Sequence, residues 1–324
     1  MKTTVPSALR ISSLCLLALS GLAQTSTLQG PAGGFLFDAP SRSVRPLIGL
    51  PGASHFGPPI LTGVPLAGVA PDQRKAVLAS ETGLQVILDL RNPYASIQNL
   101  PGAIAAPSQI LWAADSSSAV LFSASGKQLQ FLWQDGGSVL AGPSCDLASL
   151  PSPVRLLAAD PFARIAAVAA PAEEKSAVFL LREGSPPQLL GLFPSPVAAA
   201  FAPAGSSLYL AGASSLWRIA DLSAPSAAEA LWENAAELPE PVALAVSNNG
   251  QFLFLAGASS RRIRAYDLSA QRFLEDLEID NLPSGFEPFT PTSFLLNPLR
   301  EARDPVWILE TSPAPRVIFI PSGE

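Results

Sequence analysis

The single histidine, His55, and the thiol of Cys145 are the side chains best suited to nucleophilic or metal chemistry. A serine or cysteine nucleophile needs a base that a third group orients, and no such signature surrounds Ser54, His55 or Cys145. A zinc or copper site needs several His and Cys ligands at close spacing, and no further ligand lies near His55 or Cys145 in the sequence. We therefore predict no catalytic residue and no metal site, and we favour a protein that is not an enzyme.

Calcium and phosphate sites find no better support. The acidic groups at 173–174 and 275–280 lack the ligand spacing of a calcium loop. The glycine pairs at 33–34 and 136–137 lack the spacing, and the following Lys or Ser/Thr, of a phosphate-binding loop. The sequence therefore predicts no cofactor.

Any functional site must be positioned by a repeated unit. The six residues 210–215 return unchanged at 255–260, 45 positions later, and the flanking residues keep the same register. In each copy an apolar strand leads through a turn, which ends in Gly205 or Gly250, to a second and a third strand. A period of about 40 to 45 residues, made of short apolar strands, is typical of four-stranded propeller blades.

Weaker copies begin near Pro65, Pro107 and Pro153, which gives five internal blades. Near the N-terminus, the segments 35–38 and 43–48 resemble the third and fourth strands of a blade. Near the C-terminus, the segments 293–296, 306–310 and 317–320 resemble the first three. We therefore predict an all-β propeller of six four-stranded blades, with seven as the alternative, closed by pairing of the N- and C-terminal strands in a shared blade. Such closure leaves no open sheet edge.

One segment carries conflicting signals. A capping-box pattern at 226–229 opens an Ala-, Leu- and Glu-rich run that favours helix by propensity. The register of the repeat places the fourth strand of a blade at 230–233, and we predict the strand.

The order of strand, glycine-ended turn, strand and third strand ending in Asp resembles the secreted bacterial propellers of the YVTN and TolB-like class. The strongest matches are the turns 202–205 and 247–250, although Ala204 and Asn249 replace the Asp that is usual at the third turn position. The resemblance covers most of the chain. It implies scaffolds, binding proteins and occasional enzymes, so it does not imply one function.

Aspartates recur at the expected third strands, at Asp38, Asp89, Asp221 and Asp267. Because residues at equivalent places of a repeat usually serve the fold, we expect each carboxylate to bond the backbone of the following turn.

Three residues are candidates for binding a ligand or a partner: Asp72, Trp112 and Arg155. They lie in or beside first strands, which form the channel mouth of a propeller, and an aromatic ring and a long cation are frequent interface anchors. Arg155 is the strongest of the three because it is the least easily buried. Trp112 has an alternative role, which is to fill space between blades.

The N-terminal residues indicate export. Residues 1–23 carry Lys2 and Arg10, an apolar stretch and a small-residue cleavage site, as in a secretory signal peptide. We expect a flexible mature N-terminus at 24–33 and a single propeller domain at 34–324. No segment has the length of a membrane span, and the net charge of -6 argues against nucleic acid as a partner.

With the leader removed, Cys145 is the sole cysteine, so we expect no disulfide within the chain and favour a free thiol over a link between two chains. We interpret the chain as a noncatalytic module that binds a protein or a cell-surface polymer in the periplasm or outside the cell. The alternatives are a propeller lyase or hydrolase, and a small-ligand binder that uses the central channel.

Overall fold

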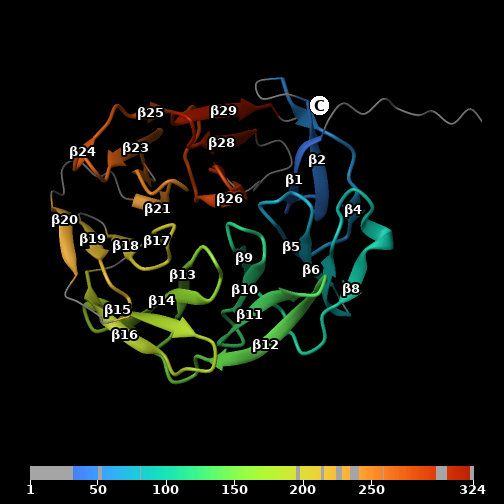
Figure 1. Cartoon of the computed structure of the whole chain (residues 1–324), viewed down its shortest axis with the longest axis horizontal. Coiled ribbons are helices and arrows are strands. Elements are labelled where there is room, and N and C mark those ends of the chain that lie inside the picture. The colour runs from blue at the N-terminus through green and yellow to red at the C-terminus, as the bar shows by residue number, and fades with distance from the viewer. Residues whose placement is uncertain are drawn as a thin grey trace, which may run out of the picture.

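The computed structural model describes residues 32–49, 53–80, 82–194, 198–212, 215–223, 228–233, 241–257, 259–296 and 305–321. These residues form seven antiparallel sheets around a central channel, which is the architecture of a seven-bladed β-propeller (Figure 1). Five of the sheets run in simple order from the channel outward, and in the other two a second short strand also pairs with an inner strand, β4 with β2 and β25 with β23. The all-β propeller class is therefore confirmed.

The strands occupy four positions in six of the blades, and three positions in blade 1 within the described residues. The first, innermost strands are β1 (Ala32–Asp38), β5 (Leu66–Val69), β9 (Gln109–Trp112), β13 (Arg155–Ala159), β17 (Ala198–Phe201), β21 (Pro241–Val246) and β26 (Glu287–Thr290). The second strands are β2 (Ser43–Ile48), β6 (Ala76–Ser80), β10 (Ser118–Ser123), β14 (Ile165–Ala172), β18 (Leu208–Ala211), β22 (Phe252–Gly257) and β27 (Ser293–Leu295).

The third strands are β7 (Gly83–Ile87), β11 (Gln128–Asp135), β15 (Lys175–Arg182), β19 (Ser215–Ile219), β23 (Arg262–Asp267) and β28 (Val306–Glu310), while β3 (His55–Phe56) and β4 (Leu61–Thr62) share this position in blade 1. The fourth strands are β8 (Ile97–Asn99), β12 (Ser138–Asp146), β16 (Gln188–Phe193), β20 (Glu229–Glu233) and β29 (Arg316–Ile320), while β24 (Arg272–Phe273) and β25 (Leu277–Glu278) share this position in blade 6. A short 3-10 helix, η1 (Pro93–Ala95), precedes β8.

The structure has seven blades, and the preference for six with a shared blade is corrected. The strands β1 and β2 were expected as the third and fourth strands of that blade, but they are the first and second strands of blade 1. The C-terminal segments, expected as the first three strands of that blade, are instead its second to fourth strands, because β26 precedes them, and together they form blade 7 separately. Within the described residues blades 1 and 7 meet through side chains, because Leu36 and Leu47 pack with Phe289 and Val306.

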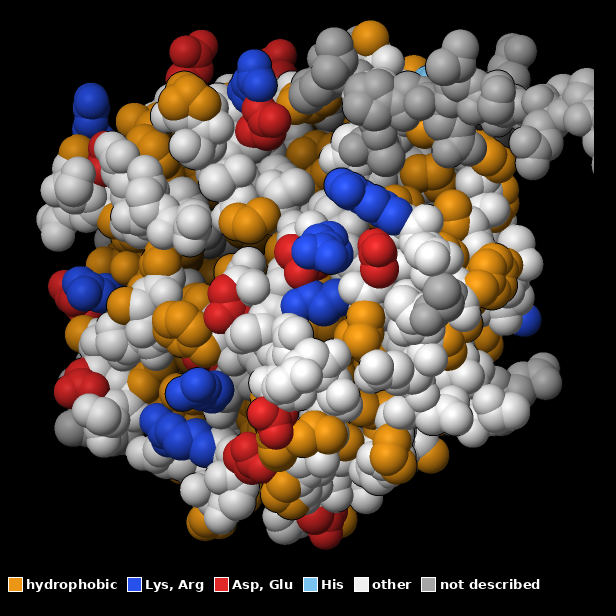
Figure 2. All heavy atoms as spheres, turned by 45° about the vertical axis from the view of Figure 1, so that its right-hand side comes forward, with side chains coloured by type: hydrophobic (Ala, Val, Ile, Leu, Met, Phe, Trp, Pro, Cys, Tyr) orange, Lys and Arg blue, Asp and Glu red, His pale blue; other side chains and the backbone are white. Residues whose placement is uncertain are grey.

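The core lies between successive blades. Every residue of β10 and β18 is buried, and side chains such as Val120, Leu121 and Leu210 are fully enclosed. Strands that neighbouring blades cover on both faces read as continuous apolar runs, which explains a chain that is 48% hydrophobic. Charged residues make up only 14% of the chain. On the face shown in Figure 2, acidic and basic side chains are interspersed with exposed hydrophobic ones.

The turns after the first strands interlock from blade to blade. The backbone N–H of Asp72 donates to Ser116 Oγ at 2.8 Å, and the N–H of Ala114 donates to the carbonyl oxygen of Pro161 at 3.1 Å. These turns therefore lie together on one face of the propeller.

Residues 229–233 of the conflicting segment form the strand that the repeat predicted, while 226–227 and 234–238 lie outside the described residues. Within β20, Trp232 pairs with Leu216 of β19. Its ring also meets that of Phe273 edge-on at 5.4 Å between centroids. Cross-strand pairing and this aromatic contact outweigh the local preference for helix.

The expected leader, 1–23, and most of the segment 24–33 lie outside the described residues. The first strand, β1, begins at Ala32. Among the described residues, no helix has both the length and the hydrophobicity that a membrane span requires.

Candidate functional site

The first strands enclose a central channel that holds two adjoining cavities of about 350 and 370 Å³. Residues of β1, β5, β9 and β26 line the first cavity, and residues of β9, β13, β17 and β21 line the second. Five residues line both cavities, which therefore meet beside β9 and the start of β26: Gln109, Leu111, Gly285, Phe286 and Pro288. Most of the lining side chains are apolar, because the first strands consist largely of Ala, Leu, Val and Phe.

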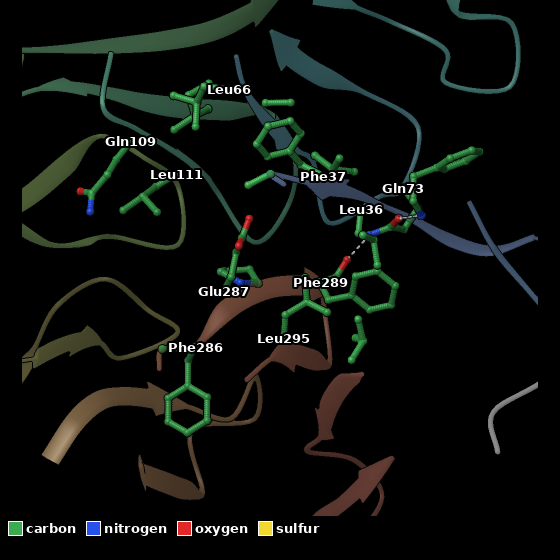
Figure 3. A pocket seen from close by; sticks show the side chains of 18 of the residues that line it. Leu36, Phe37, Leu66, Gln73, Gln109, Leu111, Phe286, Glu287, Phe289 and Leu295 are labelled. Atoms are coloured by element: carbon green, nitrogen blue, oxygen red, sulfur yellow. Dashed lines mark hydrogen bonds between the residues drawn. The ribbon is translucent and has the colours of Figure 1, made fainter. Parts of the chain in front are cut away.

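One carboxylate, that of Glu287, lies in the first cavity. Glu287 begins β26 and pairs with Leu295 of β27. Its carboxylate points into the open middle of the cavity, toward the side where Leu66 and Leu111 lie (Figure 3). The residue is partly accessible from the channel, and it has no hydrogen bond or ion pair to another described residue.

Burial raises the pKa of Glu287 from 4.5 to about 7. An ionised carboxylate loses hydration in apolar surroundings, and no positive charge among the described residues compensates for that loss. The carboxyl group is therefore divided between its protonated and ionised forms near neutral pH. It can donate a hydrogen bond in the first form and pair with a cation in the second.

The other polar groups in the channel wall are mostly committed to the fold. The side-chain amide of Gln73 donates to the carbonyl oxygen of Phe289, and its oxygen accepts from the N–H of Phe35. Asp160 accepts hydrogen bonds from three backbone N–H groups of its own turn, two of them at 2.6 Å and one at 3.4 Å. Gln109 is exposed at the start of β9, so Glu287 and Gln109 are the polar groups best placed to meet a ligand.

No protein-family profile and no curated protein sequence matches the chain. Its fold is similar to that of a protein of unknown function from Desulfotomaculum acetoxidans DSM 771, with a TM-score of 0.56 and 11% identity over 90% of this chain and 100% of that one. It is also similar to hydrazine synthase from Kuenenia stuttgartiensis, with a TM-score of 0.55 and 12% identity over 90% and 99% of the two chains.

A third similar structure is the β-propeller domain of Cps50 (Swd1) from Myceliophteria thermophila, with a TM-score of 0.53 and 14% identity over 80% of this chain and 86% of that one. At these identities the likeness shows the fold alone. The propeller fold that the YVTN and TolB-like resemblance implied is thus confirmed, and function must be argued from the site.

The structure brings two of the predicted binding residues together. Trp112 is buried at the end of β9, where its Nε1 donates to the carbonyl oxygen of Gly68 at 2.8 Å. Lys75 Nζ lies 5.9 Å from the centre of the Trp112 ring and 3.2 Å from a carboxylate oxygen of Asp72. Trp112 thus fills space between blades 2 and 3 and also borders the second cavity, while Asp72 is exposed in the turn after β5.

Arg155, the third predicted residue, lies apart from this pair. It is exposed at the start of β13. The turn that contains Pro161, which accepts a hydrogen bond from Ala114 of blade 3, follows the other end of the same strand. A strand of this length separates its two ends by roughly 13 Å. A role for Arg155 in binding therefore concerns the opposite mouth of the channel from Asp72.

The residues considered for nucleophilic or metal chemistry lie away from the channel cavities. His55 is exposed on β3, in the third strand position of blade 1. Cys145 lies on β12, the fourth strand of blade 3, where burial and then the charge of Glu183 raise the pKa of its thiol. A thiol that stays protonated is a poor nucleophile and a poor ligand. Within the described residues no group of three or more His, Cys, Asp and Glu side chains is placed to hold a metal ion.

The recurring aspartates bond the turns that follow them, as predicted. The accepting atom is Oδ1 in each case. The donors are the backbone N–H of Ser41 for Asp38 (3.4 Å), of Arg91 for Asp89 (3.2 Å), of Ser223 for Asp221 (2.8 Å) and of Ser269 for Asp267 (2.9 Å). The N–H of Ala270 and the hydroxyl of Ser269 hold the pKa of Asp267 below its ordinary value. Asp38 differs in position, because it ends a first strand and not a third.

Glu287 was not predicted as a site residue because its strand, β26, was not predicted. The segment 287–290 contains Pro288 and an acidic residue, which argue against a sheet position. An innermost strand, however, pairs on one side only, so the missing N–H of proline costs no ladder hydrogen bond when it faces the channel. A usable signal was the period itself, since a first strand was due about 45 residues after β21.

Proposed function

We propose that this protein is a noncatalytic binding module whose ligand occupies the central channel. The observation that carries the proposal is the pair of adjoining, largely apolar cavities with few convergent polar groups. Pockets of roughly 300 to 1,000 Å³ with this composition are typical small-molecule sites. The channel therefore favours the small-ligand alternative over a partner that binds only the outer surface.

A channel-filling substitution tests this proposal. Leu111 borders both cavities, and Leu111→Trp adds a large ring at their junction. We expect a neutral apolar fluorophore, N-phenyl-1-naphthylamine, to bind the unaltered protein at one saturable site and the variant at least tenfold more weakly. Leu189→Trp is the matched control, because Leu189 is 51% exposed on the outer strand β16. Equal binding by both variants, or no saturable binding at all, contradicts the proposal.

A macromolecular partner is the second candidate, and the exposed leucines of neighbouring outer strands favour it. Leu140 on β12 is 42% exposed, and Leu189 and Leu192 on β16 are 51% and 54% exposed. Exposed apolar side chains on adjacent blades suit a protein interface. Crosslinking in envelope and culture-fluid fractions should then yield one stoichiometric partner, and that partner should be lost with Leu189→Asp and Leu192→Asp.

We also propose that the protein is exported to the periplasm or the extracellular space. The charged, then apolar, then small-residue order of 1–23 supports this proposal. Fractionation of the host, with N-terminal sequencing of the recovered chain, should find the protein outside the cytoplasm with Gln24 as its first residue. Recovery of a cytoplasmic chain that still carries Lys2 would contradict it.

A further inference from the structure

We propose that the channel selects apolar ligands that carry one cationic group, of which an alkylammonium is the simplest, and that Glu287 supplies the carboxylate that pairs with the cation. This inference rests on the proposed function, because it names the ligand class for the same channel.

The position of Glu287 suits a ligand that lies along the channel. Its backbone is fixed by pairing with Leu295, and its side chain extends from the wall into the first cavity (Figure 3). Phe37, Leu66 and Leu111 line the same cavity from β1, β5 and β9. A ligand whose charged end reaches Glu287 can therefore place an alkyl or aryl body against these side chains.

No other charged group competes for the carboxylate among the described residues. Glu287 is the one titratable residue that lines the first cavity, although β1, β5, β9, β27 and β28 also contribute to its wall. Neither cavity is lined by a described Lys or Arg. Asp160, the one acidic residue that lines the second cavity, already accepts backbone hydrogen bonds.

The surroundings favour a cation over other ligand charges. A carboxylate in apolar surroundings lacks compensation for its lost hydration, and an ammonium group placed beside it supplies that compensation. A ligand carboxylate would instead place two like charges in the same cavity. An alcohol can form a hydrogen bond with Glu287 but provides no opposite charge.

Three probes with the same alkyl chain separate these cases: n-octylamine, n-octanol and octanoate. We expect calorimetry at pH 8 to show one saturable site for octylammonium, with at least tenfold weaker binding of octanol and no measurable binding of octanoate. At this pH octylammonium is protonated and Glu287 is largely ionised.

Glu287→Gln keeps the shape of the side chain and removes its charge. We expect octylammonium to bind this variant at least tenfold more weakly, while octanol binding stays within about twofold of the unaltered protein. Glu174→Gln is the matched control, because Glu174 is exposed in the turn between β14 and β15. That control should bind all three probes as the unaltered protein does.

The pH dependence gives a readout that a change in shape would not produce. Octylammonium stays protonated across this range, so its affinity should fall about tenfold per pH unit below the pKa of Glu287 and level off above it. Binding at pH 6 should release a proton, which buffers of different ionisation enthalpy report. In Glu287→Gln both the pH dependence and the proton release should disappear.

The outcomes separate this inference from the proposed function. Equal binding of octylammonium and octanol that Leu111→Trp abolishes would keep the channel as a binding site but overturn its selectivity for cations. A preference for octylammonium that persists in Glu287→Gln would also overturn the inference. Failure of all three probes to bind, together with failure of the neutral fluorophore, would overturn the proposed function as well.

Discussion

The side-chain amide of Gln73 donates a hydrogen bond to the carbonyl oxygen of Phe289, which lies 216 positions later in the chain. The same side chain accepts a hydrogen bond from the N–H of Phe35. Gln73 belongs to the turn after β5, so one residue of blade 2 ties together the first strands of blades 1 and 7. This connection lies where the N- and C-terminal blades meet, next to the cavity that holds Glu287.

Gln73→Ala should destabilise the propeller. The substitution leaves a backbone donor and a backbone acceptor unpaired at the junction of three blades, and each unpaired buried group costs about 1 to 3 kcal/mol. We expect a lower urea midpoint with an unchanged slope. Gln109→Ala is the control, because Gln109 is exposed and lines the same cavity. Equal midpoints for the two variants would show that the Gln73 contacts contribute nothing.

The charge state of Glu287 should make stability depend on pH. Its pKa is about 7 in the folded chain and near 4.5 when the chain unfolds, so the folded state holds the proton more tightly. The free energy of unfolding should therefore rise as the pH falls from about 7 toward 4.5, by at most roughly 3 kcal/mol. Above pH 7 the full cost of the buried charge applies.

Glu287→Gln isolates this contribution. The variant should be more stable than the unaltered protein at pH 8, and the difference should shrink as the pH falls toward 4.5. Urea unfolding at several pH values measures the difference, and Glu174→Gln should follow the unaltered profile. Parallel profiles for Glu287→Gln and the unaltered protein would mean that Glu287 is solvated in the folded chain.

Asp160→Ala should lower stability without a direct effect on the first cavity. The carboxylate accepts from the backbone N–H groups of Arg164 and Ile165 at 2.6 Å, and their loss should cost about 1 to 3 kcal/mol. Asp115→Ala, in the equivalent turn of blade 3, is the milder control because Asp115 is exposed. Thermal melts of both variants provide the comparison. An equal loss of thermal stability would mean that the hydrogen bonds of Asp160 stabilise the chain no more than those of the exposed Asp115.

Trp112→Phe distinguishes a structural from a binding role for this residue. The variant loses the hydrogen bond from Nε1 to the carbonyl oxygen of Gly68, which should cost about 1 kcal/mol. Trp133→Phe, which loses no hydrogen bond to a described residue, is the control. We expect the urea midpoint to fall for Trp112→Phe while probe binding stays unchanged. Weaker binding at unchanged stability would instead make Trp112 a ligand contact.

The strand order was predictable wherever the repeat is strong. The copies at 210–215 and 255–260 fix equivalent positions, and the strand at 230–233 followed from that register against its own helix propensity. The short strands β3 and β4 and the strand β26 were not predictable from local pattern. Two-residue strands carry no periodicity, and Pro288 weakens the signal of β26.

The sequence by itself determined the class of fold and the turn chemistry, because apolar strands, glycine-ended turns and aspartates act over a few neighbouring residues. Only the tertiary structure decided the number of blades and the surroundings of Glu287. Both depend on segments as distant as β1 and β26 meeting around the channel. The pKa of a carboxyl group follows the solvent and charges around it, and those are set by residues remote in the chain.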